Sequence, residues 1–217
     1  MLNSQDLNFL FAPPHWLRSL TKRLLTWQCP AGEKKIFLSF DDGPTPGLTE
    51  RVLEILEHYN ARATFFLIGK NAEAHPDLVN ALLAKNHAVG SHGWEHIDGW
   101  RTKTKAFVKN AERFPAGIST SLFRPPYGRI FPWQAKTLQS KGFQIIMWSL
   151  LSRDYEALPD LDAALEKIIR LTADGSIVVF HDSAKAKKNC LYLLPRFLDH
   201  FNKQGFSFVV LPMTQKP

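Results

Sequence analysis

The stretch LSFDDGPTP, residues 38–46, places two adjacent carboxylates at the point where an apolar run ends. The run from Ile36 to Phe40 is typical of a buried strand, and a glycine and two prolines then prevent that strand from continuing. Asp41 and Asp42 are therefore either turn formers or functional groups at a strand end. The pattern of the remaining chain decides between these interpretations.

Apolar segments of strand length alternate with segments of helical spacing along most of the chain. This alternation predicts a mostly parallel sheet covered by helices, hence an α/β barrel or an open doubly wound sheet. In both, functional residues are expected at the C-terminal ends of the strands. One domain is expected over residues 35–217, after an N-terminal segment, 1–34. The predicted strands cover 35–40, 64–68, 87–90, 121–124, 143–148, 176–180 and 206–210, and the helices 49–60, 76–85, 102–114, a segment from about 132, 161–171 and 192–203.

The composition describes a basic chain with an ample core. The 217 residues are 45% hydrophobic, and 27 basic against 20 acidic residues give a net charge of +7. Because the charges are scattered, a soluble basic surface is the first interpretation, and an anionic partner such as a cell-wall polymer or a membrane is the second. No nucleic-acid-binding module is recognised. Cys29 and Cys190 are too few for a disulfide framework; two buried thiols are expected, and a single bridge between them is the alternative.

The N-terminal segment carries neither an apolar run of spanning length nor the order of residues typical of a signal peptide. The location is left open by these observations, with a cytoplasmic or membrane-peripheral one favoured. From Trp16 to Trp27, apolar residues recur at helical spacing with Arg18, Lys22 and Arg23 between them, which predicts a basic amphipathic helix. Such a helix packs against its own domain or lies on a membrane surface, and the first is the commoner case.

Five polar segments follow predicted strands: FDDGP (40–44), SHGWEH (91–96), FRPPYG (123–128), SRDY (152–155) and FHDS (180–183). His92 and His96 are four residues apart, which predicts two imidazoles on one face of a helical turn, a spacing that suits one metal ion. Asp42 would complete a set of two histidines and one carboxylate. Adjacent side chains of an extended chain point in opposite directions, so Asp41 would remain free beside the metal.

In this order, FDDGP, HGWEH, RPPYG, SRDY and VVFHDS resemble the five motifs of the NodB-type polysaccharide deacetylases, carbohydrate esterase family four. The resemblance covers roughly residues 35–210 and implies a distorted parallel (β/α) barrel of about seven strands. It implies metal-dependent hydrolysis of the acetamide of N-acetylated amino sugars in a chitooligosaccharide or peptidoglycan type of glycan. Zn²⁺ is the first metal implied, with Co²⁺, Ni²⁺ or Mn²⁺ as alternatives. A monomer is expected, with the glycan as partner.

The resemblance also implies roles for residues that match the motifs. Asp42, His92 and His96 would be the metal ligands, Asp41 the general base that takes a proton from the attacking water, and Arg124 the side chain that holds Asp41. His181 would be the general acid for the leaving nitrogen, and Asp154 would orient it. Pro125 and Pro126 lack an N–H group, so Tyr127 carries the first main-chain donor after Arg124, and this donor would stabilise the oxyanion. Tyr127, Tyr155 and Val179 would contact the substrate, the last two around the acetyl methyl group.

Three departures from the family motifs concern loop geometry and the substrate groove more than the chemistry. Gly93 stands where serine or threonine is usual, Leu151 and Tyr155 replace an aspartate and a tryptophan, and Val179 replaces a leucine. Trp94 and Trp100 flank the metal loop, where core packing is the default and stacking on a sugar the alternative. Two rival functions stay open: deacylation of another small amide, such as a lipid-linked formamido sugar, and glycan binding without turnover.

Overall fold

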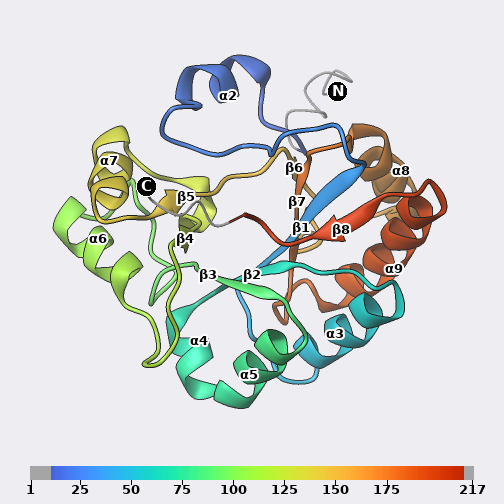
Figure 1. The fold of residues 1–217 in the computed structure, drawn as a ribbon, viewed down its shortest axis with the longest axis horizontal. Coiled ribbons are helices and arrows are strands. Elements are labelled where there is room, and N and C mark those ends of the chain that lie inside the picture. The colour runs from blue at the N-terminus through green and yellow to red at the C-terminus, as the bar shows by residue number, and fades with distance from the viewer. Residues whose placement is uncertain (1–10, 213–217) are drawn as a thin grey trace.

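The computed structural model of the chain describes residues 11–212 and contains one curled, parallel sheet (Figure 1). The strand order is β5-β4-β3-β2-β1-β7-β6, and β8 pairs with the beginning of β1. Every strand pair is parallel, so the predicted parallel α/β barrel is confirmed as a half-barrel of seven strands with β8 beside it. The strands are β1 (Lys35–Asp41), β2 (Thr64–Leu67), β3 (Ala88–Ser91), β4 (Leu122–Phe123), β5 (Gln144–Ile145), β6 (Leu150–Leu151), β7 (Ile177–His181) and β8 (Ser207–Val209).

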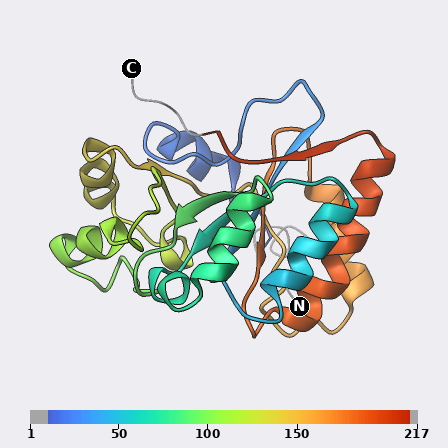
Figure 2. The same cartoon turned by 60° about the horizontal axis from the view of Figure 1, so that its bottom comes forward.

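Helices surround the sheet on the outside, as connections between parallel strands require (Figure 1). Figure 2 shows α3, in cyan, alongside α9, in red. The short α4 and β6 were not predicted, and α9 begins five residues before the predicted helix. The helices are α2 (His15–Thr21), α3 (Thr49–His58), α4 (Gly69–Ala74), α5 (Pro76–Ala84), α6 (Thr104–Glu112), α7 (Pro132–Ser140), α8 (Leu161–Leu171) and α9 (Lys187–Lys203), with a 3₁₀ turn, η1 (Pro126–Gly128).

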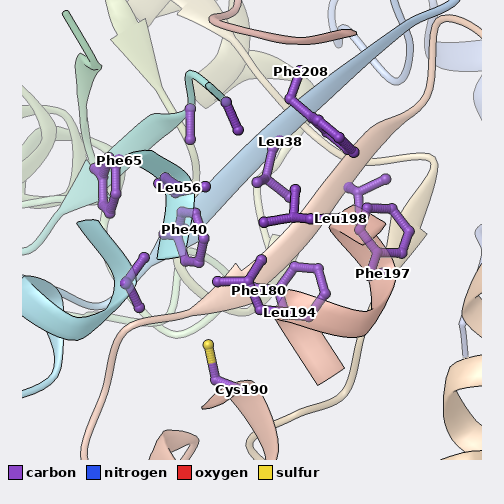
Figure 3. Close-up of a cluster of buried hydrophobic side chains, with 14 of the residues drawn as sticks. Leu38, Phe40, Leu56, Phe65, Phe180, Cys190, Leu194, Phe197, Leu198 and Phe208 are labelled. Carbon is purple, nitrogen blue, oxygen red and sulfur yellow. The ribbon is translucent and has the colours of Figure 1, made fainter. Parts of the chain in front are cut away.

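The largest hydrophobic cluster lies between the central strands and α9 (Figure 3). Every residue of β7 is buried, which accounts for the apolar run from Ile177 to Phe180. The ring of Phe180 on β7 meets Phe197 of α9 edge to face, with 5.7 Å between centroids. Phe40 stacks on Phe65 of β2 at 4.8 Å. This cluster fixes the ends of β1 and β7 side by side, where Asp41 pairs with His181 in the strand register.

The N-terminal segment is part of the barrel from residue 26 onward. Thr26 forms a bridge to Ile146, just after β5, and Gln28 forms one to Ser176, just before β7. The segment therefore runs from β5, at one edge of the curled sheet, to β7, the second strand from the other edge. The predicted helix over residues 16–27 is wrong in extent, because α2 ends at Thr21 and Trp27 is buried. The Trp27 indole N–H instead donates a hydrogen bond to the Thr21 hydroxyl (2.8 Å).

Helix α2 contributes no buried residue to the fold. Trp16 and Leu20 are 66% and 77% exposed, so the membrane contact considered for this segment stays a prediction. Within residues 11–212, no helix is long and apolar enough to span a membrane. Cys29 and Cys190 are both buried and unpaired, as expected.

Replacing Phe197 with alanine should destabilise the fold, because it removes a fully buried ring between α9 and β7. We expect a loss of about 3–5 kcal/mol in the free energy of unfolding, measured by chemical denaturation. Leu83→Ala, at an exposed position of α5, is the control and should cost less than about 1 kcal/mol. Equal losses in the two variants would contradict the assignment of the core.

Candidate active site

Asp41 ends β1 and forms a buried ion pair with Arg124 (Nη1 to Oδ1, 2.7 Å). Arg124 is fully buried, and each of its three side-chain nitrogens donates a hydrogen bond. Nη1 donates to the Ser39 hydroxyl (2.9 Å), while Nε and Nη2 donate to the carbonyls of Ile146 (3.3 Å) and Met147 (3.1 Å). A buried guanidinium needs such partners, since an unpaired charge in the interior is costly. The predicted contact between Arg124 and Asp41 is present, and it holds Asp41 in one orientation.

The main chain of Arg124 also fixes the orientation of His92. Its carbonyl lies 2.8 Å from His92 Nδ1, and a carbonyl can only accept, so Nδ1 carries the proton and Nε2 is left with a lone pair. Burial lowers the pKa of His92 to about 3, and the nearby His96 adds to this effect against the opposing charge of Asp42. His92 is therefore neutral at neutral pH, the form that binds metal ions.

Asp42, His92 and His96 converge on one point at the mouth of the barrel. Asp42 Oδ1 lies 3.7 Å from His92 Nε2 and 3.5 Å from His96 Nε2, and the three ligand atoms lie within 4.8 Å of one another. Ligand atoms 2.0–2.2 Å from one tetrahedral ion lie roughly 3.3–3.6 Å apart, so this set fits a divalent cation. Asp42 belongs to this set and Asp41 does not, although the backbone φ of Asp42 is 78°, which is not the extended conformation from which their separation was predicted.

The two histidines do not lie on a helical turn. They belong to a loop after β3, so the predicted helical placement is wrong although the two side chains do meet. The loop is held by main-chain bonds to the start of α4, where Gly69 and Lys70 donate to the carbonyls of Gly93 (2.9 Å) and Trp94 (3.1 Å). Trp94 is buried and its ring lies 3.5 Å from the Arg113 guanidinium, so it is a packing residue.

Asn110 of α6 occupies the space that a side chain at position 93 would need. Gly93 has a φ of 82°, and a Cβ there would lie 2.4 Å from Asn110 Nδ2. The Asn110 carboxamide binds both main-chain groups of Glu95, with Oδ1 accepting from N–H and Nδ2 donating to the carbonyl, each at 2.9 Å. The main-chain carbonyl of Asn110 also accepts a hydrogen bond from the Trp94 N–H (2.8 Å). An amide on a neighbouring helix thus supports the loop where a hydroxyl at position 93 is absent.

His181, at the end of β7, is paired with Asp154. His181 Nδ1 lies 2.7 Å from Asp154 Oδ1, and the His181 main-chain N–H donates to Oδ2 (2.9 Å). Burial lowers the pKa of His181, but the charge and hydrogen bond of Asp154, with smaller contributions from Asp41 and Asp42, outweigh it and raise the pKa to about 9. The imidazole is then a proton donor at neutral pH. Asn189 of α9 supports this pair by donating to the Asp154 carbonyl (2.9 Å).

A cavity of about 640 Å³ is lined by the metal-ligand set and by Asp41 and His181, one member of each of the two ion pairs. Two tyrosines line the cavity. Tyr127 contacts the ring of the metal-ligand candidate His96 (4.4 Å between centroids), and Tyr155 contacts the ring of His181 (4.6 Å). Tyr127 has a φ of 60° in η1. The two hydrogen bonds of this turn are donated by the N–H groups of Gly128 and Arg129, so the Tyr127 N–H takes part in neither of them. Val179 does not line the cavity; it is buried in β7, and Leu151 of β6 is a lining residue instead.

Asp182, directly after His181, is a structural contact under the Asp42 turn. It is fully buried, and its Oδ2 accepts from the Thr49 hydroxyl (2.7 Å). Burial raises its pKa to about 8, so the carboxyl is mostly protonated at neutral pH. Gly43 is required beside it, because a Cβ at that position would lie 2.1 Å from the carboxylate.

Residues 29–146 match the polysaccharide deacetylase family. A peptidoglycan-N-acetylglucosamine deacetylase from Bacillus cereus is 32% identical over 194 residues, which cover 86% of this chain and 91% of that protein. A chitooligosaccharide deacetylase from Rhizobium leguminosarum bv. trifolii is 27% identical over 197 residues, covering 83% and 91%. The crystal structure of the Bc1960 peptidoglycan N-acetylglucosamine deacetylase aligns with a TM-score of 0.83 at 26% identity, over 94% of this chain and 98% of that one.

The chain therefore belongs to the polysaccharide deacetylase family, and the resemblance of its motifs to that family is confirmed. As a member it is a hydrolase that acts on amide bonds of a carbohydrate.

Asn110→Ala should weaken divalent metal binding, because it releases the Glu95 main chain beside His96. We expect a roughly 10- to 100-fold rise in the dissociation constant of Zn²⁺, measured by competition with a chelating dye. Lys109→Ala, at an exposed position on the same helix, is the matched control and should leave the constant unchanged. A folded Asn110→Ala protein with unchanged zinc affinity would show that the amide is not needed for the metal loop.

Proposed function

We propose that this protein removes acetyl groups from N-acetylglucosamine residues of a glycan, with a divalent cation held by Asp42, His92 and His96. The observation that carries the proposal is the shared cavity, which is lined by a metal-ligand set, by one aspartate paired with a cation and by one histidine paired with an anion. When bound, the cation supplies Lewis acidity, which makes water a stronger acid and polarises a carbonyl group.

Asp41 is the proposed general base. Its Oδ1 is bound by Arg124, which leaves Oδ2 to accept a proton from a water molecule that attacks the acetamide carbon. Because Arg124 stays charged at any working pH, the pair keeps Asp41 at the same position before and after the proton arrives. Negative charge then develops on the former carbonyl oxygen, and the Tyr127 N–H is the proposed main-chain donor for it.

His181 is the proposed general acid. An amide nitrogen leaves poorly as an anion, so the bond to the acetyl carbon breaks when nitrogen receives a proton. The Asp154 carboxylate accepts a hydrogen bond from the Nδ1–H group of His181. The proton on Nε2 is therefore the one that can be given to the substrate. Acetate and a free amino sugar are the products. Tyr155 and Leu151, which line the same cavity, are the proposed neighbours of the acetyl methyl group.

Acetate release from N-acetylglucosamine oligomers tests the reaction, with acetate release from peptidoglycan fragments and formate release from a lipid-linked formamido sugar measured in parallel. We expect turnover that stops with a chelator and returns with Zn²⁺. Asp41→Asn should lower kcat by at least about 100-fold while metal stays bound, whereas Asp42→Ala should lose the metal. Turnover that resists the chelator would refute the metal assignment, and a fully active Asp41→Asn would refute the base.

The controls separate chemistry from folding and from binding. Asp77→Asn removes an exposed carboxylate of α5 and should change neither metal content nor turnover. A preference for the formamido sugar over every acetylated glycan would favour the alternative acyl substrate. Oligomer binding without acetate release in the metal-loaded wild type would favour a non-catalytic glycan-binding protein.

The rate should fall on the alkaline side as His181 loses its proton. Since its pKa in the folded protein is about 9, the acid form dominates at neutral pH, and the alkaline limb of kcat should lie at or below that value. Asp154→Asn removes the interactions that raise this pKa, so the limb should move toward lower pH by at least about one unit. A pH–rate profile of kcat for both proteins measures this. An unchanged alkaline limb in a folded, active variant would exclude His181 as the acid.

A further inference from the structure

An exposed aromatic surface adjoins the cavity and is not used by the chemistry proposed above. Trp100 and Tyr127 are 56% and 58% exposed, although large aromatic side chains usually bury most of their area. The Arg129 guanidinium carbon lies 5.2 Å from the centre of the Trp100 ring and 5.6 Å from that of the Tyr127 ring. The two rings therefore flank one side chain, and Tyr127 also lines the cavity. We call Trp100, Tyr127 and Arg129 the aromatic platform.

The loop that carries Trp100 is held in place from both sides by polar contacts. Asp98 accepts from the Trp100 main-chain N–H (2.9 Å) and forms an ion pair with Arg129. The fully buried Gln134 of α7 donates to the carbonyls of Gly99 (2.9 Å) and Thr102 (3.3 Å), one on each side of Trp100. A buried side chain devoted to two loop carbonyls fixes the position of the exposed indole. The loop that carries Trp100 is therefore well anchored, and the indole is exposed at a fixed position.

The charge of the platform indicates what it binds. Asp98 pairs with Arg129 and also lies 3.9 Å from the exposed Arg101, so the surface keeps at most a small positive charge and is mainly aromatic, which suits an uncharged ligand with flat apolar faces. The pyranose rings of a β-linked amino-sugar chain offer such faces, and an aromatic ring packs against them with little loss of side-chain entropy. Tyr127 joins this surface to the reacting centre through its contact with the His96 ring (4.4 Å).

We infer that the aromatic platform is a glycan subsite, which binds a sugar neighbouring the one whose acetamide lies in the cavity. This inference rests on the proposed function. It makes the enzyme one that selects oligomers and polymers over single amino sugars, because a monosaccharide in the cavity cannot reach Trp100, which is not among the residues that line it. The platform contributes to substrate binding and leaves the reaction step to the groups in the cavity.

The test compares substrates of different length with the metal-loaded enzyme. For acetate release from the N-acetylglucosamine pentasaccharide, Trp100→Ala should raise KM roughly five- to tenfold with kcat nearly unchanged. The monosaccharide should be turned over at the wild-type kcat/KM, and Trp100→Phe should recover most of the loss. Trp16→Ala, which removes a similarly exposed indole on α2, is the matched control and should change neither constant. An equal effect of Trp100→Ala on both substrates, or none on the pentasaccharide, would overturn the subsite.

A binding measurement keeps this test separate from the test of the proposed reaction. Calorimetric titration of the pentasaccharide into Asp41→Asn, and into the same variant with Trp100→Ala, should give a roughly five- to tenfold difference in Kd. If the wild type releases no acetate but this difference is found, the reaction proposal fails and the subsite stands. If acetate is released but the two dissociation constants agree, the subsite fails and the reaction stands.

Discussion

The buried guanidinium of Arg124 is the constraint on which the rest of the site depends. Its side chain binds Asp41 at the end of β1, its N–H donates to the Ser91 carbonyl (2.9 Å) at the end of β3, and its carbonyl orients His92. One residue, directly after the short β4, thus sets the base and the tautomer of a metal ligand. Because every donor of a buried cation must be used, a shift of any of these strands would leave a charge unpaired, which is far more costly than losing a surface ion pair.

Two ion pairs then determine the charges that face the cavity: one presents an aspartate held by a cation, and the other a histidine held by an anion. Asp41 faces a permanent cation, whereas His181 faces the Asp154 carboxylate, which raises its pKa to about 9 against the effect of burial. Paired groups whose surroundings favour opposite protonation states are the usual arrangement for acid and base catalysis in one site. The strand register places them side by side, since Asp41 is the direct partner of His181 between β1 and β7. The chemistry therefore depends on the register as much as on the residue types.

The alternation of strands and helices, and the placement of polar residues after strands, could be predicted from the sequence because both depend on local periodicity and on the geometry of parallel sheets. The convergence of Asp42, His92 and His96 was likewise predictable from residue chemistry. The structural reason for that convergence was not predictable. The spacing of the two histidines favoured a helical turn, whereas main-chain hydrogen bonds from the distant α4 hold them on a loop. Asn110 lies on α6 and carries no local signal of its contact with Glu95, and the burial of Val179 depends on packing across β6 and β7.

Gly93 illustrates why a departure from a family motif has to be judged in three dimensions. In the sequence it is the loss of a hydroxyl, which suggests a weaker loop. In the structure its φ of 82° and the nearby Asn110 amide make glycine the residue that fits, because any Cβ would displace the group that holds Glu95. The Asn110 amide on α6 thus supplies the support that a hydroxyl at position 93 of the loop would otherwise give. Reintroducing serine alone should be worse than glycine, since the substitution would meet both the positive φ and the amide.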